Sequence, residues 1–206
     1  MTASAGPALH EMYDEFGDRV RFLALYVREA HPGDRFPQPS DLATKTAHAR
    51  AYARRDSIRW PVAVDDADGD LHRALDPKPD AAYLVDPDGI VMFRALWAND
   101  PGPLRDALRL AASGQRGPVG ESQAKAGALM RGTGEMWRVL SAAGPAALRD
   151  VAAQAPPMWM SARVADALRP LPSGLRGGLG TVLPMLGAGG ALLGWSRRRR
   201  RRRVTA

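Results

Sequence analysis

Two short apolar runs on either side of a strong turn signal constrain the fold of this chain more than any other feature. Ala82-Tyr-Leu-Val-Asp86 and Ile90-Val-Met-Phe93 are both rich in residues that favour strands. They are joined by Asp86-Pro-Asp-Gly89, with Pro at the second position and Gly at the fourth, as in a type I turn. We therefore expect an antiparallel β-hairpin, which excludes a fold made of helices alone.

Strand and helix patterns alternate around this hairpin. Val20–Val27 is almost continuously apolar, which is typical of a buried strand, and Pro61–Val64 predicts a second strand. Ser40 is expected to cap a helix that runs to about Arg55. Shorter helical patterns lie at residues 71–75 and from 101 onward. A further short helix is predicted by an apolar stripe at positions i, i+3, i+4 and i+7, namely Leu9, Met12, Tyr13 and Phe16. This order predicts a small α/β sandwich.

Composition divides the chain into three parts. Residues 1–113 hold the α/β pattern. Residues 114–176 are rich in Gly, Ala and Pro without a strand-like run, and they predict a helical extension whose Met and Trp side chains serve packing. We expect two or three short helices there, broken at Gly144-Pro145 and Pro156-Pro157. Residues 177–206 begin with the uncharged, glycine-rich stretch Gly177–Trp195 and contain the unbroken arginine run Arg197–Arg203.

The positive charge of the chain comes from this last part. The net charge is +7, from 29 Lys and Arg against 22 Asp and Glu, and the arginine run supplies seven of those cations. The remainder is neutral, so the high isoelectric point does not indicate a folded domain that binds nucleic acid. The sequence contains no cysteine, which excludes disulfides, thiolate zinc sites and a thiol nucleophile within these residues.

Three segments of the first part resemble the iodothyronine deiodinase family and its bacterial redoxin relatives. The stretch Phe22-Leu-Ala-Leu-Tyr-Val-Arg-Glu-Ala-His-Pro-Gly-Asp34 resembles the second-strand signature of that family. Trp60–Asp65 is similar to the next strand, and Pro79–Asp86 is similar to the strand that begins with a characteristic proline. The resemblance covers about residues 8–113. It implies a thioredoxin-like fold and a thiol or selenol oxidoreductase, either deiodinase-like or peroxiredoxin-like.

The resemblance also implies which residues border the reaction. Glu29 and His31 correspond to the family's Glu and His beside the active site, where they handle substrate and protons, and we take them as the catalytic candidates. The simpler alternative is a pair that caps a loop. Pro79 corresponds to the cis-proline that faces the redox loop and is a structural candidate, with an ordinary turn proline as the alternative.

Two features of the family have no counterpart here. A thioredoxin fold has a central first strand, and the loop after it holds a reactive Cys or selenocysteine at a helix N-terminus, where the helix dipole stabilises the anion. Without that strand, the backbone N–H and C=O groups of the two flanking strands are left unpaired. Each such group that is buried lowers the stability of the fold by about 1–3 kcal/mol. We therefore expect the chain to be inactive as it stands, as an N-terminally truncated gene product would be.

One hypothesis explains both absences. Met1 would be an internal methionine, and a UGA codon for selenocysteine just before it would have been taken as a stop. The protein would then extend about 20 or more residues upstream, through a strand of about 5–6 residues and a loop with selenocysteine or Cys. The competing hypothesis is a pseudoenzyme that closes the gap by pairing strands across a homodimer.

Other polar clusters give weaker signals. Four aspartates at positions 65, 66, 68 and 70 suggest a metal loop, but no Glu closes it as in a calcium hand, and a solvated acidic turn is the preferred interpretation. His10, His48 and His72 share no ligand spacing and are expected at the surface. We predict neither a metal nor a cofactor.

The leading functional expectation is a deiodinase-like or redoxin-family oxidoreductase that uses a thiol reductant or a small-molecule substrate in its intact form. A non-catalytic thioredoxin-like binding module is the first alternative, and a membrane-surface scaffold is the second. We expect a cytoplasmic protein, peripherally attached to an anionic membrane surface through Arg197–Arg203. A basic tail that binds nucleic acid is the alternative for this segment.

Overall fold

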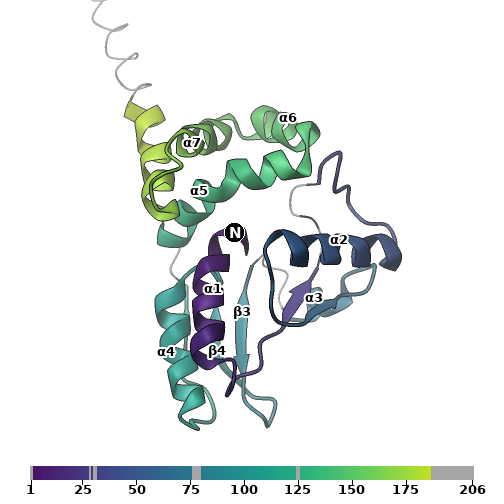
Figure 1. Ribbon diagram of the computed structural model, residues 1–206, viewed down its shortest axis with the longest axis vertical. Coiled ribbons are helices and arrows are strands. Elements are labelled where there is room, and N and C mark those ends of the chain that lie inside the picture. The colour runs from purple at the N-terminus through teal and green to yellow at the C-terminus, as the bar shows by residue number, and fades with distance from the viewer. Residues whose placement is uncertain (1, 28, 30–31, 76–79, 124–125, 187–206) are drawn as a thin grey trace, which may run out of the picture.

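The computed structural model describes residues 2–27, 29, 32–75, 80–123 and 126–186. It is a mixed α/β structure in which a helical portion is stacked on an α/β portion (Figure 1). The α/β portion contains two small sheets, one of two strands and one of three. The predicted α/β class is therefore confirmed.

The first sheet is a parallel pair connected by a helix. Strand β1 (Ala24–Tyr26) lies beside β2 (Val62–Val64), with Leu25 opposite Ala63. The connecting helix α2 (Leu42–Arg55) packs against β2. Its cap is Asp41 rather than the expected Ser40: the Thr44 N–H donates to the Asp41 carboxylate at 2.8 Å. This side chain also has a lowered pKa, chiefly because it accepts that backbone hydrogen bond.

The second sheet contains the hairpin. Strands β3 (Ala82–Val85) and β4 (Val91–Ala95) are antiparallel, which confirms the turn prediction. Strand β5 (Gly120–Ser122) pairs with β4 in parallel, although the sequence indicated no strand there. It contains no strong strand former, so pairing with β4 determines its conformation. The short helix α3 (Asp70–Leu75) lies between β2 and β3 in the chain.

Two helices form the main core with the second sheet. Helix α1 (Thr2–Phe16) and helix α4 (Pro101–Ala112) pack against each other, and α4 packs on β4. The stripe expected in the first helix is directed inward, since Met12 and Phe16 are buried. The other large buried members of this core are Leu84, Met92, Phe93, Leu104 and Leu108.

Strand β1 is less buried than its sequence predicts. The strand covers only three residues of Val20–Val27, and all three are half-buried, while the Leu23 side chain is 64% exposed. The cause is topological, because β2 is the one described strand that pairs with β1, and β3 belongs to the other sheet. The expectation of a fully buried strand was therefore wrong.

The helical portion begins with α5 (Ala126–Ala143), which packs on α1 and on α7 (Pro156–Ala167). Helix α6 (Pro145–Gln154) lies between them in the chain, and residues 173–186 form a further helix. Leu140 and Val151 are buried, and the rings of Trp137 and Trp159 meet edge to face at 5.7 Å. The predicted breaks at Gly144-Pro145 and Pro156-Pro157 coincide with the helix boundaries. Among the described residues, no helix is both long and apolar enough to cross a membrane.

Candidate functional site

The candidate site lies where the two parallel strands of the first sheet end. Glu29 follows β1 by three residues, and Asp65 and Asp66 follow β2 directly. Helix α2 presents to this region a row of side chains at positions i, i+3 and i+7, namely Lys45, His48 and Tyr52. Carboxyl ends of parallel strands are the usual place for ligand and reaction sites in α/β proteins.

One carboxylate oxygen of Glu29 is shared by two partners. The Tyr26 hydroxyl donates a hydrogen bond to Oε1 of Glu29. Nδ1 of His48 lies 3.4 Å from the same oxygen but makes no hydrogen bond to it or to any other described residue. The His48 and Glu29 side chains are 10% and 21% exposed. Carboxylates and imidazoles are the side-chain groups most often used in acid–base chemistry, so their proximity makes this pair a candidate for it.

Aromatic rings lie next to both members of this pair. The Phe36 ring meets the His48 ring edge to face at 5.2 Å, and the Tyr26 and Tyr52 rings are 6.0 Å apart. Burial, together with the hydrogen bond to Glu29, raises the pKa of the Tyr26 phenol well above its ordinary value. Burial, reinforced by the negative charge of Asp56, raises the pKa of Tyr52 to about 12. Both phenols are therefore neutral hydrogen-bond donors at physiological pH.

The buried polar groups next to the pair have structural partners. Lys45 is 2% exposed and donates from Nζ to the main-chain oxygen of Asp66. Asp65 is also buried, and its carboxylate accepts main-chain N–H bonds from Leu71 at 3.2 Å and from His72 at 3.1 Å. These bonds satisfy the amino end of α3. The acidic turn was expected to be solvated, and for Asp65 this was wrong.

Asp66 completes the turn in the same way. Its Oδ1 accepts N–H bonds from Gly69 and from Asp70, the latter at 3.0 Å. These bonds, the one from Asp70 first, lower the pKa of Asp66. Within the described residues, no three side chains of the kinds that bind metal ions converge. The geometry of these two aspartates is that of a helix start.

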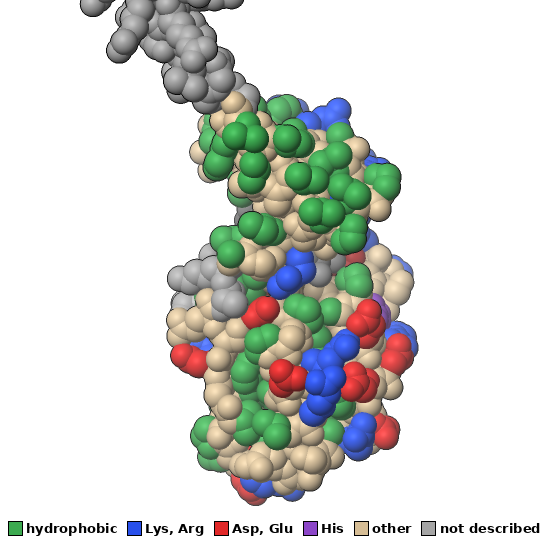
Figure 2. All heavy atoms as spheres, turned by 90° about the vertical axis from the view of Figure 1, so that its left-hand side faces the viewer, with side chains coloured by type: hydrophobic (Ala, Val, Ile, Leu, Met, Phe, Trp, Pro, Cys, Tyr) green, Lys and Arg blue, Asp and Glu red, His purple; other side chains and the backbone are tan. Residues whose placement is uncertain are grey.

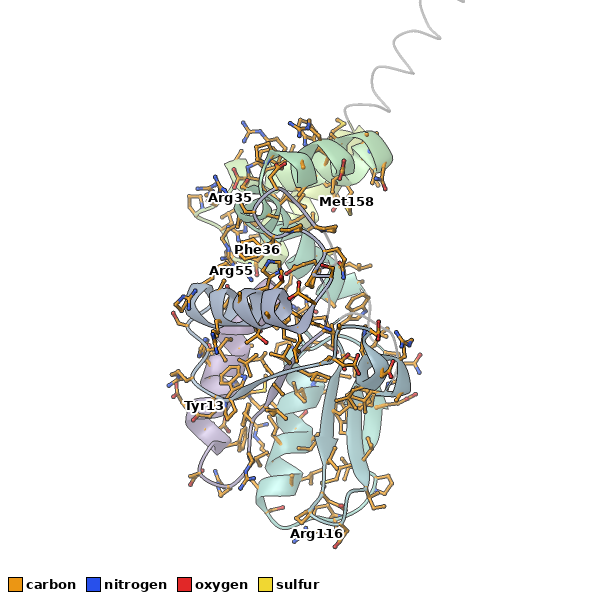
Figure 3. All side chains as sticks on the ribbon, turned by 90° about the vertical axis from the view of Figure 1, so that its right-hand side faces the viewer. Tyr13, Arg35, Phe36, Arg55, Arg116 and Met158 are labelled. Carbon is orange, nitrogen blue, oxygen red and sulfur yellow. The ribbon has the colours of Figure 1, made fainter. Side chains whose placement is uncertain are left out.

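The loop that follows Glu29 is attached to the helical portion. The main-chain N–H of Arg35 donates to the oxygen of Ala143 at 3.0 Å. The Asp34 carboxylate accepts a bond from the N–H of Ala146 at 2.7 Å. Figure 3 shows Arg35 and Phe36 on this loop, between α2 and the helical portion. The helical portion thus positions the loop that places Phe36 on His48.

The sequence-predicted site residues have different outcomes. Glu29 lies in the cluster just described, whereas His31 and Pro79 lie outside the described residues. His48 was expected at the surface, and this was wrong, because it is buried against Phe36. His10 is also partly buried: its ring lies 5.1 Å from that of Trp60. The missed signal for His48 was its place on the inner row of α2, which apolar periodicity did not reveal because that row includes Lys45.

Comparison with known proteins gives no identification. No family model, no curated protein and no solved structure matches this chain. The chemistry of the site is therefore inferred from its own geometry. The Tyr26 phenol and the His48 imidazole both lie next to one carboxylate oxygen of Glu29, at the end of a pair of parallel strands.

Proposed function

We propose that this chain is a thioredoxin-like domain of the deiodinase or redoxin type, in which Glu29 and His48 form the acid–base part of the reaction site. One observation carries the proposal. Glu29, which the sequence resemblance singles out, has its carboxylate 3.4 Å from an imidazole that the resemblance did not invoke. Two residues from separate elements thus meet where the resemblance puts the reaction.

The chemistry assigned to the pair is proton delivery. In this type of reaction a thiolate or selenolate attacks an oxidised or halogenated substrate atom, and the leaving group takes up a proton. His48, with Glu29 beside it, supplies that proton in our proposal, and Tyr26 holds the Glu29 carboxylate in place. The nucleophile is not among these 206 residues, since cysteine is absent.

The arrangement of the sheets supports the proposal. Among the described strands, β1 pairs with β2 and no other, β3 pairs with β4 and no other, and the two sheets are separate. A strand between β1 and β3 would join them and cover the half-buried β1. In our proposal that strand belongs to the segment with the nucleophile, which places the attacking atom close to Glu29.

The nucleotide sequence just upstream of the Met1 codon tests the proposal first. We expect an open frame with a UGA or Cys codon about two positions before Met1, preceded by a strand-like run. An in-frame stop other than UGA within a few codons, with no Cys codon between, contradicts the proposal. The 206-residue chain should also show no peroxidase, disulfide reductase or deiodinase turnover. Measurable turnover would contradict the proposal that the reaction requires a nucleophile from outside these 206 residues.

The role of the pair is tested in the protein extended through that segment. Glu29→Gln and His48→Asn should each lower turnover by about 10²–10⁴-fold and alter its pH profile, because each removes a member of the proton-delivering pair. Glu121→Gln is the matched control, since Glu121 is exposed and bonds only to Gln123 among the partners described. Equal turnover of Glu29→Gln and Glu121→Gln would show that the pair has no catalytic part.

A second candidate function is a non-catalytic binding module of the same fold. The absence of cysteine together with the partly exposed apolar β1 favours it. In that case upstream sequencing finds no nucleophile codon, and the half-exposed strand serves to pair with an extended partner segment. The turnover and sequencing experiments above separate the two functions.

A further inference from the structure

The helix at residues 173–186 packs against the rest of the protein through its smallest residues. A Cβ on Gly177 would lie 1.8 Å from the main-chain oxygen of Met130 on α5. A Cβ on Gly180 would lie 2.5 Å from the main-chain oxygen of Ser161 on α7. The backbone of this helix is therefore in close contact with two others along its glycine side, and there is no room for larger residues there.

The opposite side of the same helix carries its large apolar residues, and they face solvent. These residues follow one another at i, i+7, i+8 and i+11, which places them on one face. Their exposed fractions are 53%, 47%, 48% and 66% for Leu175, Val182, Leu183 and Leu186. An isolated exposed leucine needs no explanation, but a whole helix face of them marks an interaction surface. We call these four residues the outer leucine face.

Charge is distributed unevenly between the two portions of the chain. Residues 126–206 contain 13 arginines against three acidic residues, a net charge of +10. Residues 1–125 contain 16 Lys and Arg against 19 acidic residues, a net charge of −3. On the face drawn in Figure 2, hydrophobic side chains gather over the helical portion, whereas positive and negative side chains are mixed over the α/β portion. The outer leucine face therefore lies on the cationic portion, eleven residues before Arg197.

We propose that the outer leucine face docks onto an anionic membrane surface, with the arginine run Arg197–Arg203 held at the lipid headgroups. Charge complementarity and the sequence that follows the outer leucine face both favour an anionic membrane as the binding partner. Twenty residues follow Leu186 in the sequence, and seven of them are arginines in one block. An apolar helix face next to a cationic segment is the combination that binds at the interface of anionic bilayers.

This surface fits a membrane better than it fits nucleic acid or a protein groove. Nucleic acid is bound by cations and by aromatic stacking, and an exposed aliphatic face contributes to neither. The helix is also already held on its glycine side, so it presents only one face and cannot be wrapped by a groove. A planar lipid surface needs one face only, and residues 175–186 span about 16 Å of it.

Flotation with lipid vesicles tests the proposal. The full chain should float with vesicles of phosphatidylcholine mixed with phosphatidylserine and remain unbound with phosphatidylcholine alone. Leu183→Gln/Leu186→Gln should weaken binding at least about tenfold, because it removes apolar contact without disturbing the glycine side. Replacing all seven residues of Arg197–Arg203 with Gln should abolish the preference for phosphatidylserine.

The matched control is Leu71→Gln/Leu75→Gln on α3, where the two leucines are 48% and 47% exposed. This variant should bind vesicles like the unaltered chain. Equal binding by Leu183→Gln/Leu186→Gln would overturn the proposal. A second result would also overturn it: the unaltered chain self-associates in sedimentation but binds no vesicles, and the same double variant abolishes the self-association. The outer leucine face would then bind a second copy of the chain. Binding that double-stranded DNA competes away, with the leucine variant unaffected, would assign the tail to nucleic acid and also overturn it.

Discussion

The carboxylate of Asp34 accepts a hydrogen bond from the main-chain N–H of Ala146, at 2.7 Å, across 112 residues of sequence. Helix α6 has Gly144 at its N-cap and Pro145 at its first position, so it has no capping side chain of its own. Asp34, in the loop that follows Glu29 in the sequence, supplies the missing cap. The candidate site and the helical portion are therefore structurally linked.

Replacing this distant cap should cost stability. Asp34→Ala is expected to lower the free energy of unfolding by about 1 kcal/mol, since it leaves the Ala146 N–H at the start of α6 without its acceptor. Urea denaturation measures the change. Asp106→Ala is the control, because Asp106 makes an exposed i,i+3 pair with Arg109 and such pairs contribute little. If the two variants lose the same stability, the Asp34 contact is not a cap.

The three-way contact on Glu29 Oε1 predicts coupling between its members. Tyr26→Phe removes the hydroxyl that donates to Glu29, and Glu29→Gln removes the charge that accepts it. A double-mutant cycle should give a coupling free energy of about 1 kcal/mol in urea unfolding. The same cycle between Tyr26 and the exposed Glu121 should give a value near zero. Additive effects for Tyr26 and Glu29 would show that the hydrogen bond contributes nothing to folding.

Much of the α/β portion follows from local sequence pattern. The hairpin at Asp86–Gly89 was predictable because the turn chemistry and both flanking runs depend on adjacent residues. Met12 and Phe16 were placed inward correctly because helical spacing is also local. Strand β5 was not predictable, since it is formed by pairing with β4 rather than by its own residues.

The candidate site was only half predictable for the same reason. Glu29 was found because it belongs to a short contiguous motif. His48 is nineteen positions further on, and only the packing of α2 against the first sheet brings its ring to the Glu29 carboxylate. Asp34 was not recognised as a helix cap because the helix it serves begins more than a hundred residues later.

The raised pKa of Tyr52 predicts a loss of stability in alkali. The phenol is neutral in the folded state up to a pKa of about 12, whereas in the unfolded chain it ionises near its ordinary value of 10. Between pH 10 and pH 12 the folded state therefore binds more protons at Tyr52 than the unfolded state does. The stability that the neutral phenol contributes is fully present below pH 10 and is lost as the pH rises toward 12. The unaltered chain should lose about 2–3 kcal/mol relative to Tyr52→Phe over this window. Urea unfolding at a series of pH values measures this, and parallel pH curves for the two proteins would contradict it.

Neighbouring glycines in the helix at residues 173–186 give the most direct test of how it is attached. At Gly177 a new Cβ would meet the Met130 oxygen at 1.8 Å, while at Gly178 the nearest atom is the Met130 sulfur at 3.6 Å, an ordinary contact distance. Gly177→Ala should therefore destabilise the protein by about 1–3 kcal/mol through overpacking. Gly178→Ala should be neutral or stabilise by up to about 1 kcal/mol, because alanine favours helix.

Thermal or urea unfolding of the two alanine variants, made side by side, measures this difference. The comparison cancels helix propensity, because both substitutions are Gly to Ala within the same turn. Equal stability of the two variants would mean that this helix does not pack on α5 by its glycine side, and the outer leucine face would then have no fixed orientation. A loss confined to Gly177→Ala shows that the glycine contact holds the helix with its leucines directed outward.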